Sequence, residues 1–385
     1  MSDIIIPKTL GIIGGGQLGL MLAEAANNLP EYIKKIIVLD PTKNCPATQT
    51  GARQIQAQYS DKEALTRLAD ESDIITFEIE SGDAQILESL KDRTQVQPPP
   101  GTLAIIQDKL LQKQFLKKSN LPVPNFTKIE SLNDLKEKIK QFNYPALLKT
   151  CRYGYDGRGN QKISDESQLH MAFEKFANTP TMLEEYVEFD LEVSIIAARN
   201  TKGQICTYPL VENIHKDNIL RTTIAPARVA DTIKEKAESI AQHTMNVLKG
   251  AGVFGIEMFV KGDKILINEI APRVHNSGHH TLQSCKVSQF EQHLRAIMGL
   301  DMNGSELKKG AVMSNILGTD RFTGKYESVV INEKDVFLKM YNKVESKPLR
   351  KLGHFTVTGD KTNIEELIKY ADVIHSKINL KQVKD

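Results

Sequence analysis

The sequence predicts an α/β protein in which an N-terminal parallel-sheet βαβ domain is followed by α+β lobes. Short apolar runs alternate with amphipathic helical segments over the first hundred residues, a pattern typical of buried parallel strands joined by helices. A glycine cluster follows the first apolar run, which indicates a strand-to-helix turn. Two longer apolar runs flank a tight turn at Asp263 and indicate a buried hairpin.

The first part of the chain contains three predicted strands, at residues 10–13, 35–39 and 73–77, because each is a short and nearly continuous apolar run. Between the first two, apolar residues from Leu18 to Ala25 recur at helical spacing. The proline-rich run at 98–101 should stop regular structure and mark a domain boundary.

The rest of the chain mixes predicted helices and strands without an internal repeat. Helices are expected at 108–119, 231–249, 290–298 and from 363 onward. Strands are expected at 145–149, 181–183, 192–199, 204–210, 336–340 and 354–358, and a hairpin at 253–260 and 265–270.

Charge and cysteine content exclude several classes of function. The 50 basic and 48 acidic residues leave a net charge of +2, which provides no electrostatic case for nucleic acid or an anionic membrane as a partner. The four cysteines form no CxxC pair, so neither a zinc site nor a disulfide framework is indicated. No secretory signal or spanning apolar segment is visible, and we expect a cytoplasmic protein.

The glycine cluster at residues 14–19 is the first candidate for chemistry. A strand, then glycines, then a helix start exposes backbone amides to a ligand, which suits phosphate or another anion. Asp40, after the next strand, would bind the ribose in a dinucleotide interpretation. A tight strand-to-helix turn requires the same glycines, so on this motif alone both interpretations stay open.

A second candidate is Lys149 with the glycine-rich loop 154–160. The glycines permit close backbone approach to a triphosphate, and the lysine adds a point charge. The spacing is not that of a P-loop. Taken alone, the loop is better interpreted as a mobile surface turn with a solvated lysine.

The third candidate is the pair Glu257 and Glu269, which lie symmetrically about Asp263. If Gly262, Asp263 and Lys264 form a three-residue turn, the two glutamates face each other across the hairpin. Opposed like charges are unfavourable unless a cation neutralises them, and Mg²⁺ bound to phosphates needs few carboxylates. A slipped register that sends one glutamate to solvent is the alternative.

Two further segments are rich in polar groups. Residues 271–280 follow a predicted buried strand and contain Arg273, His275 and His279. Lys343, Arg350 and Lys351 form a basic cluster that could bind a substrate phosphate, although a solvated face is the ordinary alternative.

Together these motifs resemble the 5-(carboxyamino)imidazole ribonucleotide synthase family. The resemblance rests on GGGQLG, EIE at 78–80, DKLLQKQ, YDGRGN and NEIAPRVHNSGHH, and it extends from about residue 10 to about residue 358. It implies an ATP-grasp ligase that uses ATP, Mg²⁺ and bicarbonate to carboxylate the exocyclic amine of 5-aminoimidazole ribonucleotide in purine biosynthesis. It also implies a homodimer and three parts: a substrate domain at 1–107, a small lobe with a glycine-rich lid at 108–185, and a large lobe with the substrate-phosphate region at 186–385.

The resemblance also assigns roles to residues. Those expected at ATP are Lys109, Lys149, Gly154, Tyr155, Asp156, Gly157, Arg158, Gly159, Asn160, Glu184, Glu185, Tyr186, Val187, Glu192, His215, Asn268 and Glu269, with Glu257 and Glu269 on the metal. Those expected at the ribonucleotide are Gln17, Leu18, Glu78, Asn276, Lys343, Arg350 and Lys351. Arg273, His275 and His279 are the candidates to hold the small anion, and strict alternation along the strand would point Asn268 away from the face of Glu269.

The chain departs from the family pattern at two places. Tyr153 stands where many members have glycine, and Lys347-Pro348-Leu349 replaces a more usual Arg-Pro-Gly. The formate-using glycinamide ribonucleotide transformylase shares the fold, but YDGRGN and RVHNSGH resemble the carboxylating enzyme.

Overall fold

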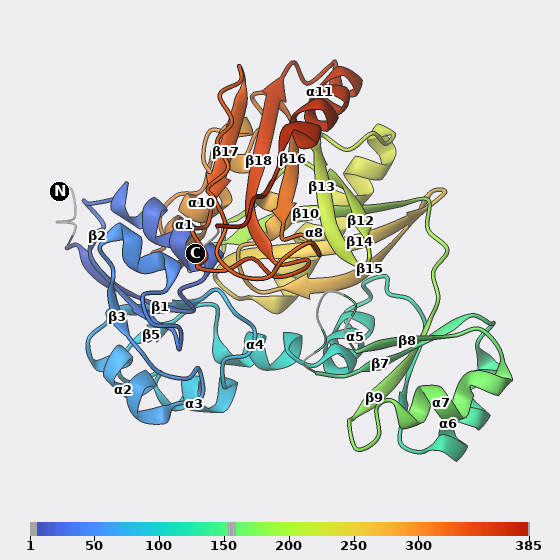
Figure 1. Ribbon diagram of the computed structural model, residues 1–385. Helices are drawn as coiled ribbons and strands as arrows, with labels where there is room; N and C mark the ends of the chain where they lie inside the picture. Colours follow the sequence, from blue (N-terminus) through green and yellow to red (C-terminus); the bar gives the residue numbers. More distant parts are fainter. Residues whose placement is uncertain (1–5, 153, 155–156, 158, 384–385) are drawn as a thin grey trace.

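The computed structural model describes residues 6–152, 154, 157 and 159–383. The residues Tyr153, Tyr155, Asp156 and Arg158, singled out above, lie outside the described part of the chain. Within that part, the chain forms three sheets (Figure 1).

The N-terminal sheet is parallel and has the strand order β3-β2-β1-β4-β5, as the alternating pattern predicts. Its elements are β1 (Lys8–Ile13), α1 (Gln17–Asn27), β2 (Ile33–Leu39), β3 (Arg53–Ile55), α2 (Lys62–Asp70), β4 (Ile74–Phe77), α3 (Ala84–Ser89) and β5 (Gln95–Val96). The prediction that the proline run stops regular structure is wrong. Helix α4 (Pro100–Ile106) begins there, because proline is tolerated at the first helical position.

The small lobe is a four-stranded antiparallel sheet with the order β6-β9-β7-β8. It comprises α5 (Lys109–Lys118), β6 (Phe126–Ile129), α6 (Leu132–Lys138), β7 (Ala146–Thr150), β8 (Asn160–Ile163), α7 (Leu169–Glu174) and β9 (Thr181–Glu185). Helices α6 and α7 cover one face of this sheet, where Leu135, Leu148 and Leu183 are fully buried (Figure 1).

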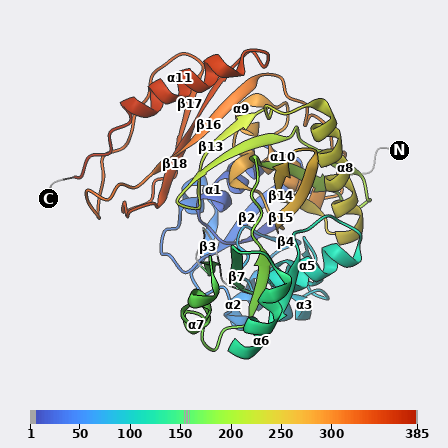
Figure 2. The same ribbon diagram turned by 90° about the vertical axis from the view of Figure 1, so that its right-hand side faces the viewer.

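The large sheet has the strand order β15-β14-β10-β12-β13-β16-β18-β17, with β11 paired to β10. Its strands are β10 (Leu191–Arg199), β11 (Ile205–Thr207), β12 (Val211–Lys216), β13 (Ile219–Ala225), β14 (Gly252–Lys261), β15 (Lys264–Ala271), β16 (Gly310–Leu317), β17 (Val336–Met340) and β18 (Lys351–Gly359). Its helices are α8 (Asp231–Leu248), α9 (Thr281–Ser284), α10 (Gln289–Ile297) and α11 (Ile364–Lys377), and α11 lies against β16 and β18 (Figure 2).

The sequence interpretation missed three of these strands, β12, β13 and β16. Strand β12 carries polar residues from Glu212 to Lys216 because it lines a cavity, so it lacks an apolar run. It turns into β13 through Asp217 and Asn218, which both have positive φ, a conformation that these two residue types tolerate. The expected strand at 204–210 is only the short β11.

Helix α5 joins the small lobe to the edge strand β15 of the large sheet. The side-chain amide of Gln112 binds both backbone groups of Ile270, accepting from its N–H at 3.1 Å and donating to its carbonyl at 3.3 Å. Lys113 donates to the carbonyl of Ile267 at 3.0 Å. These side chains thereby provide hydrogen-bond partners for backbone groups of Ile267 and Ile270 on the edge of the sheet. Lys109, in the first turn of α5, lies beside Glu269.

Candidate active site

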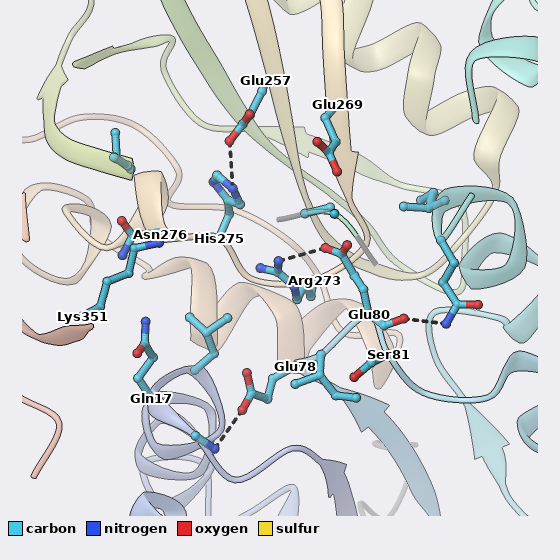
Figure 3. A pocket seen from close by; sticks show the side chains of 18 of the residues that line it. Gln17, Glu78, Glu80, Ser81, Glu257, Glu269, Arg273, His275, Asn276 and Lys351 are labelled. Carbon is cyan, nitrogen blue, oxygen red and sulfur yellow. Dashed lines mark hydrogen bonds and ion pairs between the residues drawn. The ribbon is translucent and has the colours of Figure 1, made fainter. Parts of the chain in front are cut away.

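One cavity of about 1960 Å³ lies between the three sheets. It is lined by Gln17, Leu18 and Glu78 from the N-terminal domain, by Lys109 and Lys149 from the small lobe, and by residues of the large sheet and the C-terminal segment, including Glu257, Asn268, Glu269, Arg273, His275, Asn276, Lys343, Arg350 and Lys351. Figure 3 shows Glu257, Glu269, Arg273, Glu80 and Glu78 following one another down its wall. Segments far apart in the sequence therefore share one site.

Glu257 and Glu269 are direct partners across the β14–β15 hairpin, as predicted, but for a different reason. The predicted three-residue turn is wrong. Lys261 pairs with Lys264, so the turn has two residues, and this register alone would place Asn268 opposite Glu257. A bulge after Glu257 leaves Asn268 unpaired and moves Glu269 into register.

The bulge also corrects the expectation that Asn268 points away from Glu269. An extra residue in one strand interrupts the strict alternation of side chains. Both Asn268 and Glu269 therefore line the cavity, together with Glu257.

Each carboxylate of the pair has a cationic or hydrogen-bonding partner. Lys109 Nζ lies 2.6 Å from Glu269 Oε2. His275 Nε2 lies 3.2 Å from Glu257 Oε1 (Figure 3). Burial raises the pKa of Glu257, but the hydrogen bond and charge of His275, with the charges of His215 and Lys109, lower it by more, to about 2. Glu257 is thus a carboxylate at neutral pH.

These two carboxylates fit a magnesium ion. Among the residues described, no group of three or more histidine, cysteine, aspartate or glutamate side chains is arranged to hold a metal. Mg²⁺ needs only one or two protein carboxylates when phosphate oxygens and water complete its shell. Glu257 and Glu269 face the same cavity from adjacent strands, so they supply that donor set.

A buried ion triad lies beside the pair, at the junction of the two lobes. Glu184 pairs with Lys149 and also with Lys113, at 3.1 Å. Burial raises the pKa of Glu184, but the two lysines lower it by more, to about 2. The pKa of Lys113 is lowered to about 8 by burial and by the charge of Lys149. Sequence interpretation missed Lys113, although it lies one helical turn after Lys109 in the DKLLQK motif.

The remaining residues expected at ATP are only partly brought to the cavity. Glu192 and His215 form an ion pair on its wall, and Gly154, Gly157 and Asn160 also line it. Glu184 lines a second, smaller cavity that also touches Lys109 and Lys149. Glu185, Tyr186, Val187 and Gly159 are not among the described residues that line either cavity.

At the opposite end, the C-terminal basic cluster meets the N-terminal domain. Lys343 Nζ donates to Gln17 Oε1 at 2.6 Å, and Arg350 Nη1 donates to the carbonyl of Glu345 at 2.9 Å. Burial, with the charge of Arg350, lowers the pKa of Lys343 to about 8. Lys343, Arg350 and Lys351 all face the cavity, so this cluster is part of the site and not a remote solvated face.

Two amides of the glycine cluster already have carboxylate partners, which weakens the dinucleotide interpretation. The Gly15 N–H donates to Asp40 Oδ2 at 2.8 Å, and the Gly16 N–H donates to Glu78 Oε1 at 2.8 Å. Asp40 also accepts from the Tyr59 hydroxyl at 2.9 Å. Asp40, which the dinucleotide interpretation assigned to a ribose, is thus engaged with the protein itself.

Glu78 is held at this position at an energetic cost. It is 7% exposed, and burial raises its pKa from 4.5 to about 7, against the lowering effect of the Gly16 N–H and Arg273. Between these two pH values the folded protein binds a proton that the unfolded chain has lost. Stability should therefore fall as pH rises from 4.5 to 7, and then level off.

We expect Glu78→Gln to remove this pH dependence, because glutamine can still accept from Gly16 but carries no charge. Relative to the variant, the native protein should lose on the order of 3 kcal/mol of unfolding free energy between pH 4.5 and 7. Urea unfolding across this range measures the difference. The exposed Glu31→Gln is the control, and parallel pH curves for native protein and Glu78→Gln would contradict the assignment.

The structure does not support His279 as a residue that holds the anion. The 3-10 turn η4 (Asn276–Gly278) redirects the chain, so His279 is fully buried and is not among the described residues that line the cavity. Its ring packs against Phe290 and His354, and burial lowers its pKa well below the usual value. His279 belongs to the core under the site.

Arg273 and Asn276 do face the cavity, and each is held by a residue that the role assignment omitted. Arg273 Nη2 lies 2.8 Å from Glu80 Oε1 of the N-terminal domain (Figure 3). Asn276 Nδ2 donates to Asn315 Oδ1 of β16 at 3.1 Å. Glu80 was visible in the EIE motif directly after a strand, whereas Asn315 lies in a strand that was not predicted.

Comparison with known proteins defines the class of this protein. Family models match residues 7–107 (ribonucleotide synthetase preATP-grasp domain), 114–290 (ATP-grasp domain) and 311–368 (phosphoribosylaminoimidazole carboxylase C-terminal domain). The fold is therefore that of an ATP-grasp ligase.

Individual relatives then identify the family. The N5-carboxyaminoimidazole ribonucleotide synthase of Bacillus subtilis is 39% identical over 357 residues, which cover 92% of this chain and 93% of the relative. The chain belongs to the N5-carboxyaminoimidazole ribonucleotide synthase family. The crystal structure of the Thermotoga maritima synthetase has a TM-score of 0.87 at 39% identity, covering 98% of this chain and 100% of that one. The Aspergillus clavatus enzyme, solved with ADP and 5-aminoimidazole ribonucleotide, has a TM-score of 0.87 at 32% identity, with 97% and 99% coverage.

A search of the described helices finds none that is long and apolar enough to cross a membrane.

Proposed function

We propose that this cavity carboxylates the exocyclic amine of 5-aminoimidazole ribonucleotide with bicarbonate and ATP, releasing ADP and phosphate, as a step of purine biosynthesis. The observation that carries the proposal is that one cavity joins three sets of groups. These are paired carboxylates beside lysines, an arginine and histidine next to them, and a basic cluster at the far end. They suit a nucleotide triphosphate, a small anion and a phosphorylated substrate, respectively.

The ATP end is formed at the junction of the small and large lobes. Lys109 and Lys149 reach the cavity from the small lobe and are suited to bind phosphate oxygens as point charges. Glu192 and His215, on neighbouring strands of the large sheet, are suited to the ribose. We assign the glycine-rich loop 154–160 to the cover over the triphosphate, because Gly154, Gly157 and Asn160 line the same cavity.

Glu257 and Glu269 would hold Mg²⁺, which supplies charge neutralisation and orientation at the β- and γ-phosphates when it is bound. Lys109 pairs with Glu269, and His275 donates a hydrogen bond to Glu257. Nucleotide binding would then release Lys109 from Glu269 toward the phosphates. Attack of bicarbonate on the γ-phosphate would break its bond to ADP and form carboxyphosphate, and attack of the amine on the carboxyl carbon would then release phosphate. Exclusion of water from the cavity would protect the anhydride.

Arg273 and His275 are the groups we assign to the bicarbonate or carboxyphosphate. Both line the cavity, and they lie between the carboxylate pair and the ribonucleotide end (Figure 3). The guanidinium of Arg273 presents a planar fork to a carboxylate, and Glu80 of the N-terminal domain orients it. The anion would thus be held beside the amine that it carboxylates.

The ribonucleotide end is formed by the N-terminal domain and the C-terminal segment together. Gln17, Leu18, Glu78 and Asn276 are suited to the sugar and base, and Lys343, Arg350 and Lys351 to the phosphate. Binding energy at a phosphate remote from the reacting amine can position that amine.

We expect Arg350→Ala to weaken the use of the ribonucleotide far more than the use of ATP. A lost charge-assisted contact costs about 1.5–3 kcal/mol, or roughly one to two powers of ten in kcat/KM. Steady-state kinetics with ribonucleotide varied, then ATP varied, measures this. Arg321→Ala, an exposed arginine outside the cavity lining, is the control. If Arg350→Ala changed only the dependence of the rate on ATP, the basic cluster would belong to the nucleotide site.

We also propose the division of the chain into a substrate domain at 1–107, a small lobe at 108–185 and a large lobe with the phosphate region at 186–385. The three sheets support it, because each falls within one of these ranges. A homodimer and a cytoplasmic location complete the proposal; the four cysteines are free thiols, as suits a reducing compartment.

Phosphate release with ATP, Mg²⁺ and bicarbonate, measured with and without 5-aminoimidazole ribonucleotide, tests the function. We expect release to depend on the ribonucleotide and to match formation of the carboxylated product. Release without ribonucleotide and without product would contradict the proposed substrate.

A further inference from the structure

A continuous chain of hydrogen bonds runs from His275 on the cavity wall into the core of the large sheet. His275 Nδ1 lies 2.9 Å from Ser277 Oγ, which lies 2.8 Å from Ser194 Oγ on β10. Ser194 Oγ lies 2.8 Å from Asn213 Nδ2 on β12, and Asn213 Oδ1 lies 3.1 Å from Thr223 Oγ1 on β13. Ser194, Ser277 and Thr223 are fully buried, so each hydroxyl depends on this chain for its partners.

The direction of donation along the chain follows from its first member. The carboxylate of Glu257 can only accept, so the nitrogen 3.2 Å away, His275 Nε2, must carry a proton. Nδ1 is an acceptor, because the Ser277 backbone N–H is directed at it. The Ser277 hydroxyl donates to it, and the Ser277 backbone N–H approaches the same atom at 3.4 Å.

The remaining links agree with this direction. The Ser277 hydroxyl donates to His275, so its oxygen accepts from the Ser194 hydroxyl. Ser194 in turn accepts from the Asn213 amide. Thr223 donates to the carbonyl oxygen of Asn213. Every hydrogen bond points toward the cavity, and no member of the chain has to donate twice from a single proton.

The position of His275 is set by two other contacts. The side-chain amide of Gln289 holds its backbone, accepting from the His275 N–H at 2.9 Å and donating to its carbonyl at 2.7 Å. The imidazole lies over Gly255 of β14, where an added Cβ would come within 2.6 Å of His275 Cβ and Cγ. The ring is therefore confined next to Glu257, and Glu257 and the hydrogen-bond chain together favour a proton on Nε2.

We propose that Ser277, supported by Ser194 and Asn213, is a positioning residue that holds His275 as the Nε2-protonated tautomer, with that N–H directed into the cavity. The inference rests on the proposed function only in taking His275 to act on the carboxylating anion. The opposite tautomer would direct a lone pair at the carboxylate of Glu257, which is repulsive, and would offer no donor to an incoming anion.

The first test is the tautomer itself, measured without substrate. The ¹⁵N spectrum of histidine-labelled protein distinguishes protonated from unprotonated ring nitrogens, and His275→Gln identifies the His275 signals among the nine histidines. We expect an unprotonated Nδ1 and a protonated Nε2. A protonated Nδ1 in the native protein would overturn the proposal, whether or not the enzyme carboxylates the ribonucleotide.

The second test is the effect of Ser277→Ala. We expect His275 to become a mixture of tautomers and kcat to fall roughly threefold to tenfold, with little change in KM for ATP. Ser194→Ala keeps the direct Ser277 contact and should have a smaller effect in the same direction. Ser284→Ala is the matched control, because Ser284 is equally buried and lies 2.7 Å from Nδ1 of His280, whose ring is also buried.

A double-variant comparison separates positioning from a general structural effect. Because Ser277 acts through His275, Ser277→Ala should have no further effect on kcat in a His275→Ala background. An equal loss in both backgrounds, or a loss equal to that of Ser284→Ala, would overturn the proposal.

Discussion

Replacement of Glu269 by glutamine should lower ATP-dependent phosphate release about a hundredfold or more while the protein remains folded. The variant keeps the size and hydrogen-bonding capacity of the side chain but removes one of the two carboxylates proposed for Mg²⁺, and metal stabilisation of the transferring phosphoryl group amounts to several kcal/mol. Lys109, which lies 2.6 Å from Glu269, also loses its partner. Phosphate release at several Mg²⁺ concentrations, with circular dichroism as the test of folding, measures the effect.

The matched control for this variant is Glu130→Gln. Glu130 accepts from Lys128 at the same distance of 2.6 Å, but the pair lies on the exposed surface of the small lobe. Exposed ion pairs contribute little, so its activity should be native. If Glu269→Gln released phosphate at a near-native rate, Glu269 would not be a metal ligand.

Replacement of Arg273 by methionine should lower product formation by about two to three powers of ten, the range measured when one donor to a developing anion is removed from an active site. Methionine preserves much of the apolar length of the side chain and removes the guanidinium. Because Arg273 pairs with Glu80 and is not among the residues assigned to ATP, thermal stabilisation by ATP and Mg²⁺ should persist.

Arg295→Met provides the comparison, since Arg295 lies 2.8 Å from Glu291, the same distance that separates Arg273 from Glu80. Arg295 is outside the lining of the cavity, so product formation should be unchanged. If Arg273→Met instead lost only stabilisation by ATP, Arg273 would belong to the nucleotide site.

The parts of the site that were predicted from sequence are those held by local geometry. Glu257 and Glu269 lie on two strands joined by a short turn, so a pattern of apolar residues and one glycine was enough to place them together. Even there the register was decided by a bulge that the sequence does not display, and this bulge also brought Asn268 to the cavity.

Contacts between distant segments could not be predicted from spacing or composition. Glu80 meets Arg273 and Gln17 meets Lys343 only because the N-terminal domain packs against the rest of the chain. Asn276 meets Asn315 within the large lobe, 39 positions further along the chain. Whether an amide or charge along the chain is free or already occupied is also decided at this level. The glycine amides illustrate this, since Asp40 and Glu78 reach them from other strands.

The sequence by itself determined the fold class, the order of the main motifs and, through their resemblance, the family. These follow from hydrophobic periodicity and from residue types at short spacing, which act locally along the chain. Only the tertiary structure decided that His279 faces the core while His275 faces the cavity, and that a buried line of hydroxyl and amide groups ends at His275. The physical reason is that burial and hydrogen-bond partnership depend on which segments pack together, and this packing brings together residues separated by as many as 326 positions in the chain.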